Sequence, residues 1–345
     1  MKRTPRAFVS RLPLAFLVFL LLMPLQDLSE GSQASDETGP GTRGNTARME
    51  TDPEDADRGL TLIAPYNQLS VYLVDGDKKI VHTWKSDRRT SGTVELLPNG
   101  TLLRVRTGLI GQVDGGHMLD WDGSVLWDYS PPHPYTCHHD IEAMPNGNVL
   151  MNVGSLYNQS DILKLGRDPD NTREHIPVEP ILEVRPKGKD EGTIVWKWDP
   201  TDHIVQDYDA NLPNFGVVAD HPELIDINYP YELQEEWTHI NSVAYNAELD
   251  QVMVTDRNFG EFWIIDHNTT TEEAADHNGG ARGKGGDILY RWGNPRTYGV
   301  GNVSDQILLG PHDAHWIDTG HPGEGHVMVF NNGADVNDTR PQGKF

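Results

Sequence analysis

The sequence contains a single cysteine, Cys137, among its 345 residues. No disulfide can form within such a chain, and metal motifs built from CxxC pairs are excluded. A lone cysteine can act as a nucleophile, but the two histidines that follow it belong to a repeated pattern with a better explanation. The sequence therefore directs attention away from thiol chemistry.

Basic residues are also scarce, because 28 Lys and Arg stand against 52 Asp and Glu and leave a formal net charge of −24. After the first few residues no Lys/Arg cluster is available to face phosphates, which excludes nucleic acid as a partner. The acidic excess is spread along the chain and indicates a solvated surface that would suit a saline habitat. An anionic substrate would need basic groups gathered within one site.

No apolar run reaches the roughly twenty residues that a membrane-spanning helix needs. The longest run, Leu12–Leu25, follows a positively charged start that contains Lys2, Arg3, Arg6 and Arg11. This pattern predicts an export signal over residues 1–28, with an uncleaved N-terminal anchor as the alternative. Contact with a membrane is expected only through this segment.

The next residues, 29–58, are rich in Ser, Gly, Asp, Glu and Thr and have almost no apolar side chains. Such a segment cannot bury a core and is expected to be a disordered spacer. The folded part is expected over residues 59–345, outside the cytoplasm, in the periplasm, at the cell surface or in the medium.

Glycine and proline, in contrast, are abundant, with 34 and 23 residues. This abundance favours a turn-rich β protein. Four segments each carry a turn followed by alternating β-branched and aromatic residues, which predicts a short strand that ends near a tryptophan. They are "KKIVHTW" at Lys78–Trp84, "GSVLWDY" at Gly123–Tyr129, "GTIVWKW" at Gly192–Trp198 and "GDILYRW" at Gly286–Trp292. The tryptophans Trp84, Trp127, Trp198 and Trp292 recur at one position, so we expect them to pack in the core.

A second phrase follows each of these strands, and it consists of an apolar strand, a tight turn such as "PNG" and a second apolar strand. Asn-Gly is a strong hairpin signal. The copies lie at Thr93–Val105, His139–Val153, His239–Thr255 and His312–Phe330. Four copies of the same two-phrase unit predict an all-β fold with repeated sheets, a β-propeller. A β-sandwich is the alternative, but it does not naturally repeat this unit four times.

The aligned hairpins place His139, His239 and His312 at one equivalent position, which Gly92 occupies in the first copy. The inner strand of a propeller blade starts at the central channel, so three histidines are expected to face one funnel. They could hold a metal ion, or one could attack while the others bind an anion. A structural turn device is the alternative without chemistry.

The residues around the histidines favour an anion. Asn241 lies two positions after His239 and is expected on the same strand face, and Arg257 lies on the return strand of that hairpin. An arginine would repel a metal ion, whereas arginine, asparagine and imidazoles together suit an oxyanion such as sulfate or phosphate. Asp140 and Asp313 directly follow histidines, so we expect them to bond backbone or a neighbouring blade.

These motifs resemble the arylsulfate sulfotransferase family of bacteria and archaea, which does not use phosphoadenosine phosphosulfate. The resemblance covers Leu60 to the C-terminus. Its motifs are "HHDIEAMPNGNVL", "HINSV" followed by the arginine of "TDRNFGEFWIID", and "PHDAHW" with "GHVMVFNNG". The resemblance implies a six-bladed β-propeller that moves a sulfuryl group from an aryl sulfate to a phenol by a ping-pong mechanism, with no metal and no cofactor.

The resemblance also implies roles for individual residues. His312 would be the nucleophile that becomes sulfohistidine. His139, His239, Asn241 and Arg257 would bind the sulfuryl oxygens, and one imidazole would protonate the leaving phenolate.

The other histidines in these motifs are expected to lie outside the site. His138 is expected to face away from His139, and His315 away from the channel, while His321 and His326 are expected to be exposed.

The chain departs from the family pattern at its end. Only four or five blades' worth of repeat is visible before "RPQGKF", so the sequence predicts an incomplete or C-terminally truncated propeller. Two other functions therefore stay open: a non-catalytic propeller that binds or scaffolds, and a metal-dependent lyase or oxidoreductase that uses the three histidines. The natural donor and acceptor and the oligomeric state are not predicted.

Overall fold

The computed structural model describes residues 59–108, 113–230 and 236–333. These residues belong to a single unit of the chain. The expected export signal, the polar spacer and the terminal "RPQGKF" lie outside the described residues. Within the described residues, no helix has both the length and the apolar character that crossing a membrane requires.

Three antiparallel sheets form the centre of the fold, two with four strands and one with five, and each contains four strands that follow one another in chain order. The first contains β4 (Thr90–Leu96), β5 (Leu102–Thr107), β6 (Val113–Leu119) and β7 (Val125–Tyr129). The second contains β8 (Thr136–Ala143), β9 (Val149–Asn158), β11 (Ile181–Lys187) and β12 (Glu191–Trp198). The third contains β15 (Ile240–Asn246), β16 (Gln251–Asp256), β17 (Glu261–Asp266) and β18 (Ile288–Trp292).

Smaller sheets lie before, between and after these three. The chain starts with β1 (Thr61–Ile63), β2 (Ser70–Val74) and β3 (Ile80–Lys85), and its last hairpin is β19 (Pro311–Trp316) and β20 (Val327–Asn331). Strand β10 (His175–Val178) pairs with the far end of β9, and β13 (Ile204–Val205) pairs in parallel with β14 (Ile225–Asp226). The helices are short: α2 (Gln159–Lys164), α3 (Thr271–Ala274) and the 3₁₀ turns η1 (Pro169–Asn171), η2 (Pro200–Asp202), η3 (Val218–Asp220), η4 (Pro295–Tyr298) and η5 (Val303–Asp305).

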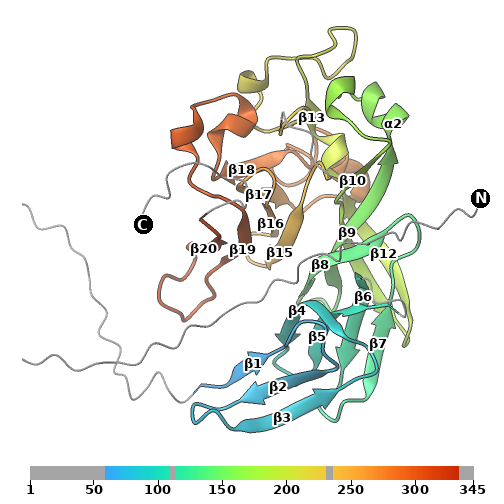
Figure 1. The fold of residues 1–345 in the computed structure, drawn as a ribbon, viewed down its shortest axis with the longest axis vertical. Coiled ribbons are helices and arrows are strands. Elements are labelled where there is room, and N and C mark those ends of the chain that lie inside the picture. Colours follow the sequence, from blue (N-terminus) through green and yellow to red (C-terminus); the bar gives the residue numbers. More distant parts are fainter. Residues whose placement is uncertain (1–58, 109–112, 231–235, 334–345) are drawn as a thin grey trace, which may run out of the picture. The chain divides into compact units, whose positions relative to one another are not determined.

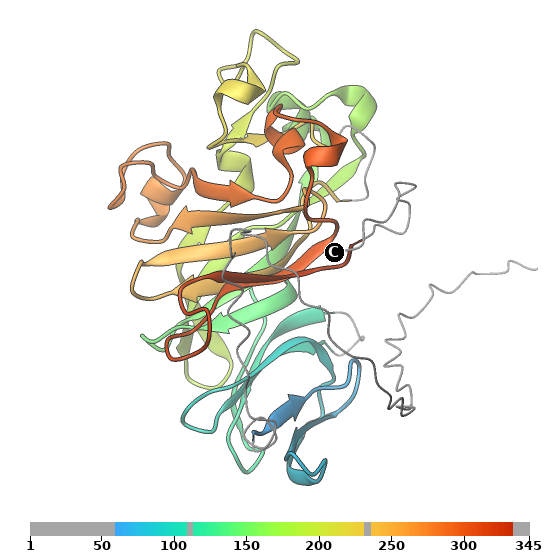
Figure 2. The ribbon, with the colours of Figure 1, turned by 90° about the vertical axis from the view of Figure 1, so that its left-hand side faces the viewer.

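The first strand of each sheet contacts the first strand of the next. Strand β4 contacts β8, β8 contacts β15, and β15 contacts β19. Figures 1 and 2 show the succession of sheets from blue to red. Sequential four-stranded sheets joined through their first strands are the blades of a β-propeller, which confirms the predicted all-β fold. The described residues contain three complete blades, and the expected number of six stays a prediction.

The strand-ending tryptophans seal one blade against the next. Trp127 donates its indole N–H to the Glu191 carbonyl at 2.9 Å, and Trp198 donates to the Gly286 carbonyl at 2.8 Å. These two and Trp84 are buried, as the repeat predicts. Trp292 differs, because its side chain is 37% exposed. The next sheet has only β19 and β20 in the described part of the chain, so no outer strand covers this indole.

The inner strands share an irregularity that the sequence did not predict. The pairing register shifts within β4, β8, β15 and β19, each time near the start of the hairpin. His139 in β8 has φ 57° and Asp313 in β19 has φ 52°, which is unusual for residues other than glycine. These are β-bulges, which re-aim side chains next to functional sites. The simple alternation of strand faces therefore fails at the predicted histidines.

Candidate active site

Two of the three aligned histidines meet where the first strands of two blades adjoin. His139 lies within β8, and His239 directly precedes β15. Their Nε2 atoms are 3.1 Å apart, so one imidazole donates a hydrogen bond and the other accepts it. The structure thus brings together residues 100 positions apart, as the hairpin alignment predicts.

A carboxylate that the sequence analysis missed completes this pair. The Nδ1 atom of His239 contacts the side-chain carboxylate of Glu236. Burial alone would raise the pKa of Glu236, but the hydrogen bond and the nearby charge of His239 outweigh it and hold that pKa below its usual value. Glu236 is therefore an anion that orients His239, and its position three residues before the histidine was the only sequence signal.

His138 forms a second histidine–carboxyl pair beside the first. Its ring centroid lies 4.0 Å from that of His139 and 5.3 Å from that of His239. The prediction that His138 faces away from His139 is therefore wrong, because the bulge at His139 interrupts the alternation. The Nδ1 atom of His138 contacts the buried carboxyl group of Glu179. Burial lowers the pKa of His138 and raises that of Glu179 well above its usual value, so both groups are held uncharged.

The pKa of His139 falls furthest within this group. Burial, followed by the nearby histidines, lowers the pKa of His139 to about 3. The imidazole is therefore neutral at neutral pH and offers one N–H donor and one lone pair. Such a ring can hydrogen-bond an anion without carrying a competing charge.

His312 in β19 is held in one tautomer by its own backbone. Its Nδ1 atom lies 3.0 Å from the Gly310 carbonyl oxygen, which can only accept, so Nδ1 carries the hydrogen. The Asn332 amide is farther away, at 3.4 Å. Burial lowers the pKa of His312, the Gly310 bond opposes this effect, and the charges of His239 and Arg257 lower the pKa further. The neutral ring therefore keeps a lone pair on Nε2.

Arg257 and Asn241 are the other two predicted residues. The backbone N–H of Arg257 donates to the His239 carbonyl at 2.9 Å, and its guanidinium lies close enough to depress the pKa of His312. Asn241 is buried in the β15 bulge, and its side chain donates to the Pro311 carbonyl at 2.9 Å. Asn241 therefore ties β15 to β19 directly before His312, while its side-chain oxygen has no hydrogen-bond partner among the described residues.

Asp140 bonds a neighbouring blade, as predicted. Its carboxyl group accepts from the Val243 N–H at 2.8 Å and from the Thr93 side chain, and burial raises its pKa to about 7. Asp313 instead lines a cavity of about 590 Å³ between the later halves of the inner strands. His315 lines the same cavity, which does not include His139, His239 or His312, and His321 and His326 are exposed as expected. Further acidic residues on the cavity wall are Glu95, Glu142, Glu248, Asp318 and Glu324.

The cysteine and the tryptophan that precedes the His239 strand are both buried. Cys137 is buried, and burial raises the pKa of its thiol to about 12, which leaves no thiolate for nucleophilic chemistry. Trp237 is buried and donates to the Tyr229 carbonyl at 2.9 Å, so it packs in the core instead of lining a pocket.

The channel histidines do not form a tight set of metal ligands. Within the described ranges, the one group whose three ligand atoms all lie within 4.8 Å of one another is His203, His277 and Asp287, outside the channel. In the channel, His139 and His239 lie within hydrogen-bonding distance of each other.

Comparison with known proteins places this arrangement in a family. The arylsulfotransferase (ASST) family model matches residues 45–344. The chain belongs to the arylsulfotransferase family. Among curated members, the arylsulfate sulfotransferase AssT of Escherichia coli O6:H1 (strain CFT073) is 28% identical over 225 residues, which cover 57% of this chain and 34% of the relative. The enzyme of the same name from Lelliottia amnigena is 25% identical over 224 residues, with the same shares. The chain thus spans about a third of the length of these relatives.

Likenesses to solved structures are remote. Hydrazine synthase from Kuenenia stuttgartiensis has a TM-score of 0.44 and 14% identity, with 81% of this chain and 70% of that chain covered. The β-propeller domain of Cps50 (Swd1) from Myceliophthora thermophila has a TM-score of 0.34 and 11% identity, with 79% and 80% covered.

Proposed function

We propose that this protein transfers a sulfuryl group from an aryl sulfate to a phenolic acceptor by a ping-pong mechanism through a sulfohistidine on His312. The observation that carries the proposal is the contact between His312 Nδ1 and the Gly310 carbonyl oxygen, at 3.0 Å. It leaves the Nε2 lone pair of a neutral imidazole available for attack. The Asp that orients the histidine of a serine protease performs a comparable task.

The first half-reaction forms one bond and breaks another. His312 Nε2 attacks the sulfur atom, the bond between sulfur and the aryl oxygen breaks, and the aryloxide leaves with that electron pair and takes a proton. In the second half, the oxygen of a phenol attacks the same sulfur atom, the bond between sulfur and Nε2 breaks, and the phenol proton passes to a base. The enzyme ends in its starting state.

The Glu236–His239–His139 chain is the proposed source and acceptor of that proton. The Glu236 carboxylate contacts Nδ1 of His239, and the Nε2 atoms of His239 and His139 lie 3.1 Å apart. A proton can move along these atoms to the leaving oxygen and return from the acceptor phenol. No cofactor takes part in either step.

Charge is the second requirement, because the transferred group spreads negative charge over three oxygens. Arg257 is the proposed cation for this group, and the neutral His139 is a proposed donor. Fixed donors aimed at developing charge account for most of the rate enhancement in comparable group transfers. Asn241 takes part through its bond to the Pro311 carbonyl, which fixes the strand that carries His312.

We also propose that the enzyme works outside the cytoplasm. The proposal relies on the sequence of residues 1–28, where a basic start and a short apolar run have the pattern of an export signal. Fractionation of cells that express the full chain tests it, since retention in the cytoplasm would contradict it.

The activity is tested with p-nitrophenyl sulfate as donor and phenol as acceptor. Release of nitrophenol should depend on phenol, and the wild-type protein incubated with donor alone should carry one acid-labile sulfuryl group on His312. His312→Ala should lower kcat/KM by about 1,000-fold or more. His315→Ala, three residues along the same strand, is the matched control and should retain activity.

The outcome against the proposal is equally specific. If the folded full chain releases no nitrophenol and acquires no label, the protein is a binding or scaffold propeller. If release persists in His312→Ala, another residue is the nucleophile.

A further inference from the structure

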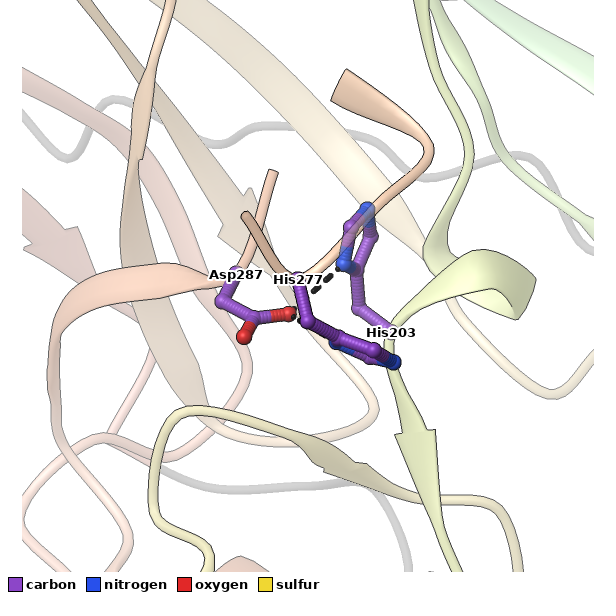
Figure 3. Close-up of side chains that lie close together, drawn as sticks. All are labelled: His203, His277 and Asp287. Carbon is purple, nitrogen blue, oxygen red and sulfur yellow. Dashed lines mark hydrogen bonds and ion pairs between the residues drawn. The ribbon is translucent and has the colours of Figure 1, made fainter. Parts of the chain in front are cut away.

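Three side chains converge outside the channel, and the proposed sulfuryl transfer does not use them. His203 follows the 3₁₀ turn η2, His277 lies in the loop after α3, and Asp287 directly precedes β18. Their nearest ligand atoms all lie within 4.8 Å of one another. Figure 3 shows both imidazoles and the carboxylate turned toward one another.

Both imidazoles contact the same carboxylate oxygen. Asp287 Oδ1 lies 2.9 Å from His203 Nδ1 and 2.7 Å from His277 Nδ1. The other ring nitrogen of His203, Nε2, lies 2.8 Å from the Ala274 carbonyl oxygen. A carbonyl oxygen only accepts hydrogen bonds, so Nε2 carries a hydrogen and Nδ1 of the neutral ring carries a lone pair.

The Nδ1 atom of His203 and the carboxylate oxygen of Asp287 would both be acceptors if neither carried a hydrogen. A proton on one of the two groups, or a metal ion, must therefore lie between them. In proteins, a histidine that ligates a metal usually donates its other N–H to a carbonyl or carboxylate, as His203 does toward Ala274.

The surrounding residues fix His203 before any ion binds. The Trp198 ring stacks parallel to it, with centroids 5.8 Å apart and an interplanar angle of 3°. Trp198 in turn donates to the Gly286 carbonyl at 2.8 Å. A side chain at Gly286 would come within 2.6 Å of His203 Nε2 and 2.1 Å of the Ala274 oxygen, so this close approach requires glycine. A rigid ligand of this kind is what a metal site needs.

Access and charge also suit a cation. The side chain of His203 is fully buried and that of Asp287 is 8% exposed, whereas that of His277 is 52% exposed and gives a route from solvent. The Asp202 carboxylate lies within electrostatic reach of both imidazoles. Two buried ligands with one accessible ligand allow an ion to enter without unfolding the site.

We propose that His203, His277 and Asp287 bind a divalent transition metal ion of the zinc class. Two imidazole nitrogens and one carboxylate oxygen form a ligand set that zinc accepts, and water would supply the fourth position. The ion would connect the segment after β12, in one blade, with the loop between β17 and β18 in the next. Its role is to hold two blades together at a distance from the sulfuryl-transfer residues.

The test uses the full chain after dialysis against a chelator. Zinc titrated against a chromophoric chelator should bind one ion per chain, and His277→Gln should abolish this binding. His175→Gln is the matched control, because the His175 side chain is 55% exposed, close to the 52% of His277, and also lies beside a carboxylate. His139→Gln should still bind zinc, which separates this site from the channel histidines.

Two further readouts do not depend on activity. Co²⁺ should give the visible absorption of a low-coordinate site in the wild type and not in His277→Gln. A hundredfold excess of zinc over Kd should raise the melting temperature of the wild type by about 5 °C. The proposal is overturned if the wild type binds no stoichiometric zinc, or if binding survives His277→Gln and disappears in His139→Gln.

Discussion

At the scale of single residues, backbone carbonyl groups decide which histidine nitrogen is available. The Gly310 carbonyl takes the Nδ1 hydrogen of His312, and the Ala274 carbonyl takes the Nε2 hydrogen of His203. The same interaction thus directs a lone pair to Nε2 in one ring and to Nδ1 in the other. We propose the first ring as the nucleophile and the second as a metal ligand, although the two side chains are chemically identical.

The pKa of His312 gives a prediction for the pH dependence of turnover. Burial lowers this pKa from the usual value of about 6.5, so the neutral, nucleophilic ring persists to lower pH. We expect kcat/KM for p-nitrophenyl sulfate to stay level as the pH falls through 6.5 and to decline only below it. Initial rates between pH 4.5 and 8 measure the acidic side of this pH profile. A decline centred at or above pH 6.5 contradicts the assignment.

Removal of the Glu236 charge gives a second prediction. Glu236→Gln keeps a hydrogen-bond acceptor near His239 but removes the negative charge beside its Nδ1 atom. We expect kcat to fall by about 100-fold, the lower end of what general acid–base assistance contributes. The loss should shrink for donors whose phenols are more acidic, since these leave without a proton.

The control for that variant is Glu223→Gln, because Glu223 also contacts a histidine, His221, at 3.2 Å and lies outside the channel. It should leave the rate unchanged. Equal losses with acidic and ordinary phenols would assign Glu236 to folding alone.

At the scale of elements, the sequence predicts strands well and misses their irregularities. Period-two patterning locates all four hairpins, and "PNG" turns mark the first two, because both signals are local. The bulges have no local signature, because each depends on the strand that packs beside it. For this reason His138 lies beside His139 instead of opposite it. The alignment of the hairpins still grouped the three histidines, because the bulge occurs near the same position in each inner strand and so does not disturb the alignment.

The first bulge gives a third prediction. A side chain at Gly92 would meet the His139 carbonyl oxygen at 2.1 Å. Gly92→Ala must therefore push the β8 bulge away, and we expect a loss of about 2–4 kcal/mol in stability together with reduced turnover. Urea unfolding and initial rates measure the two effects.

The matched control is Gly154→Ala in β9, where the added carbon meets its nearest neighbour at 3.9 Å. This variant should unfold at about the wild-type urea concentration. If Gly92→Ala behaves like Gly154→Ala, the contact between β4 and the bulge is looser than described.

At the scale of the whole molecule, repetition is what makes the propeller predictable. Four copies of one unit predict stacked sheets, and the buried tryptophans confirm how they stack. The acidic cavity and the His203–His277–Asp287 group were not predicted. Their members come from segments far apart in the chain, and only the packing of one blade on another brings them together. Trp292 is partly exposed because only a complete neighbouring blade would bury its indole ring.

The acidic cavity gives a fourth prediction. Burial, followed by Glu95 and Asp140, raises the pKa of Glu142 to about 9. The unfolded chain releases this proton near pH 4.5, so the protonated Glu142 stabilises the fold at low pH, and that stability is lost as the pH rises toward 9. The Glu142→Gln variant should not show this pH-dependent decrease in unfolding free energy. At pH 8 it should be more stable than the wild type by about 1–2 kcal/mol. Urea titrations at pH 5 and pH 8 measure the difference, and an equal effect at both contradicts the shift.

The hydrogen bonds between inner strands determine how the protein loses activity when it begins to unfold. His139, His239 and His312 come from three consecutive blades, and single contacts such as Asn241 to Pro311 and Asp140 to Val243 keep these blades in register. The proposed catalytic centre takes residues from all three blades, so it exists only while the blades are docked, much as a shared site exists only in an assembled oligomer. Mild heat or denaturant should therefore abolish activity while every sheet is still folded. Loss of activity is then the most sensitive measure of whether the blades are docked.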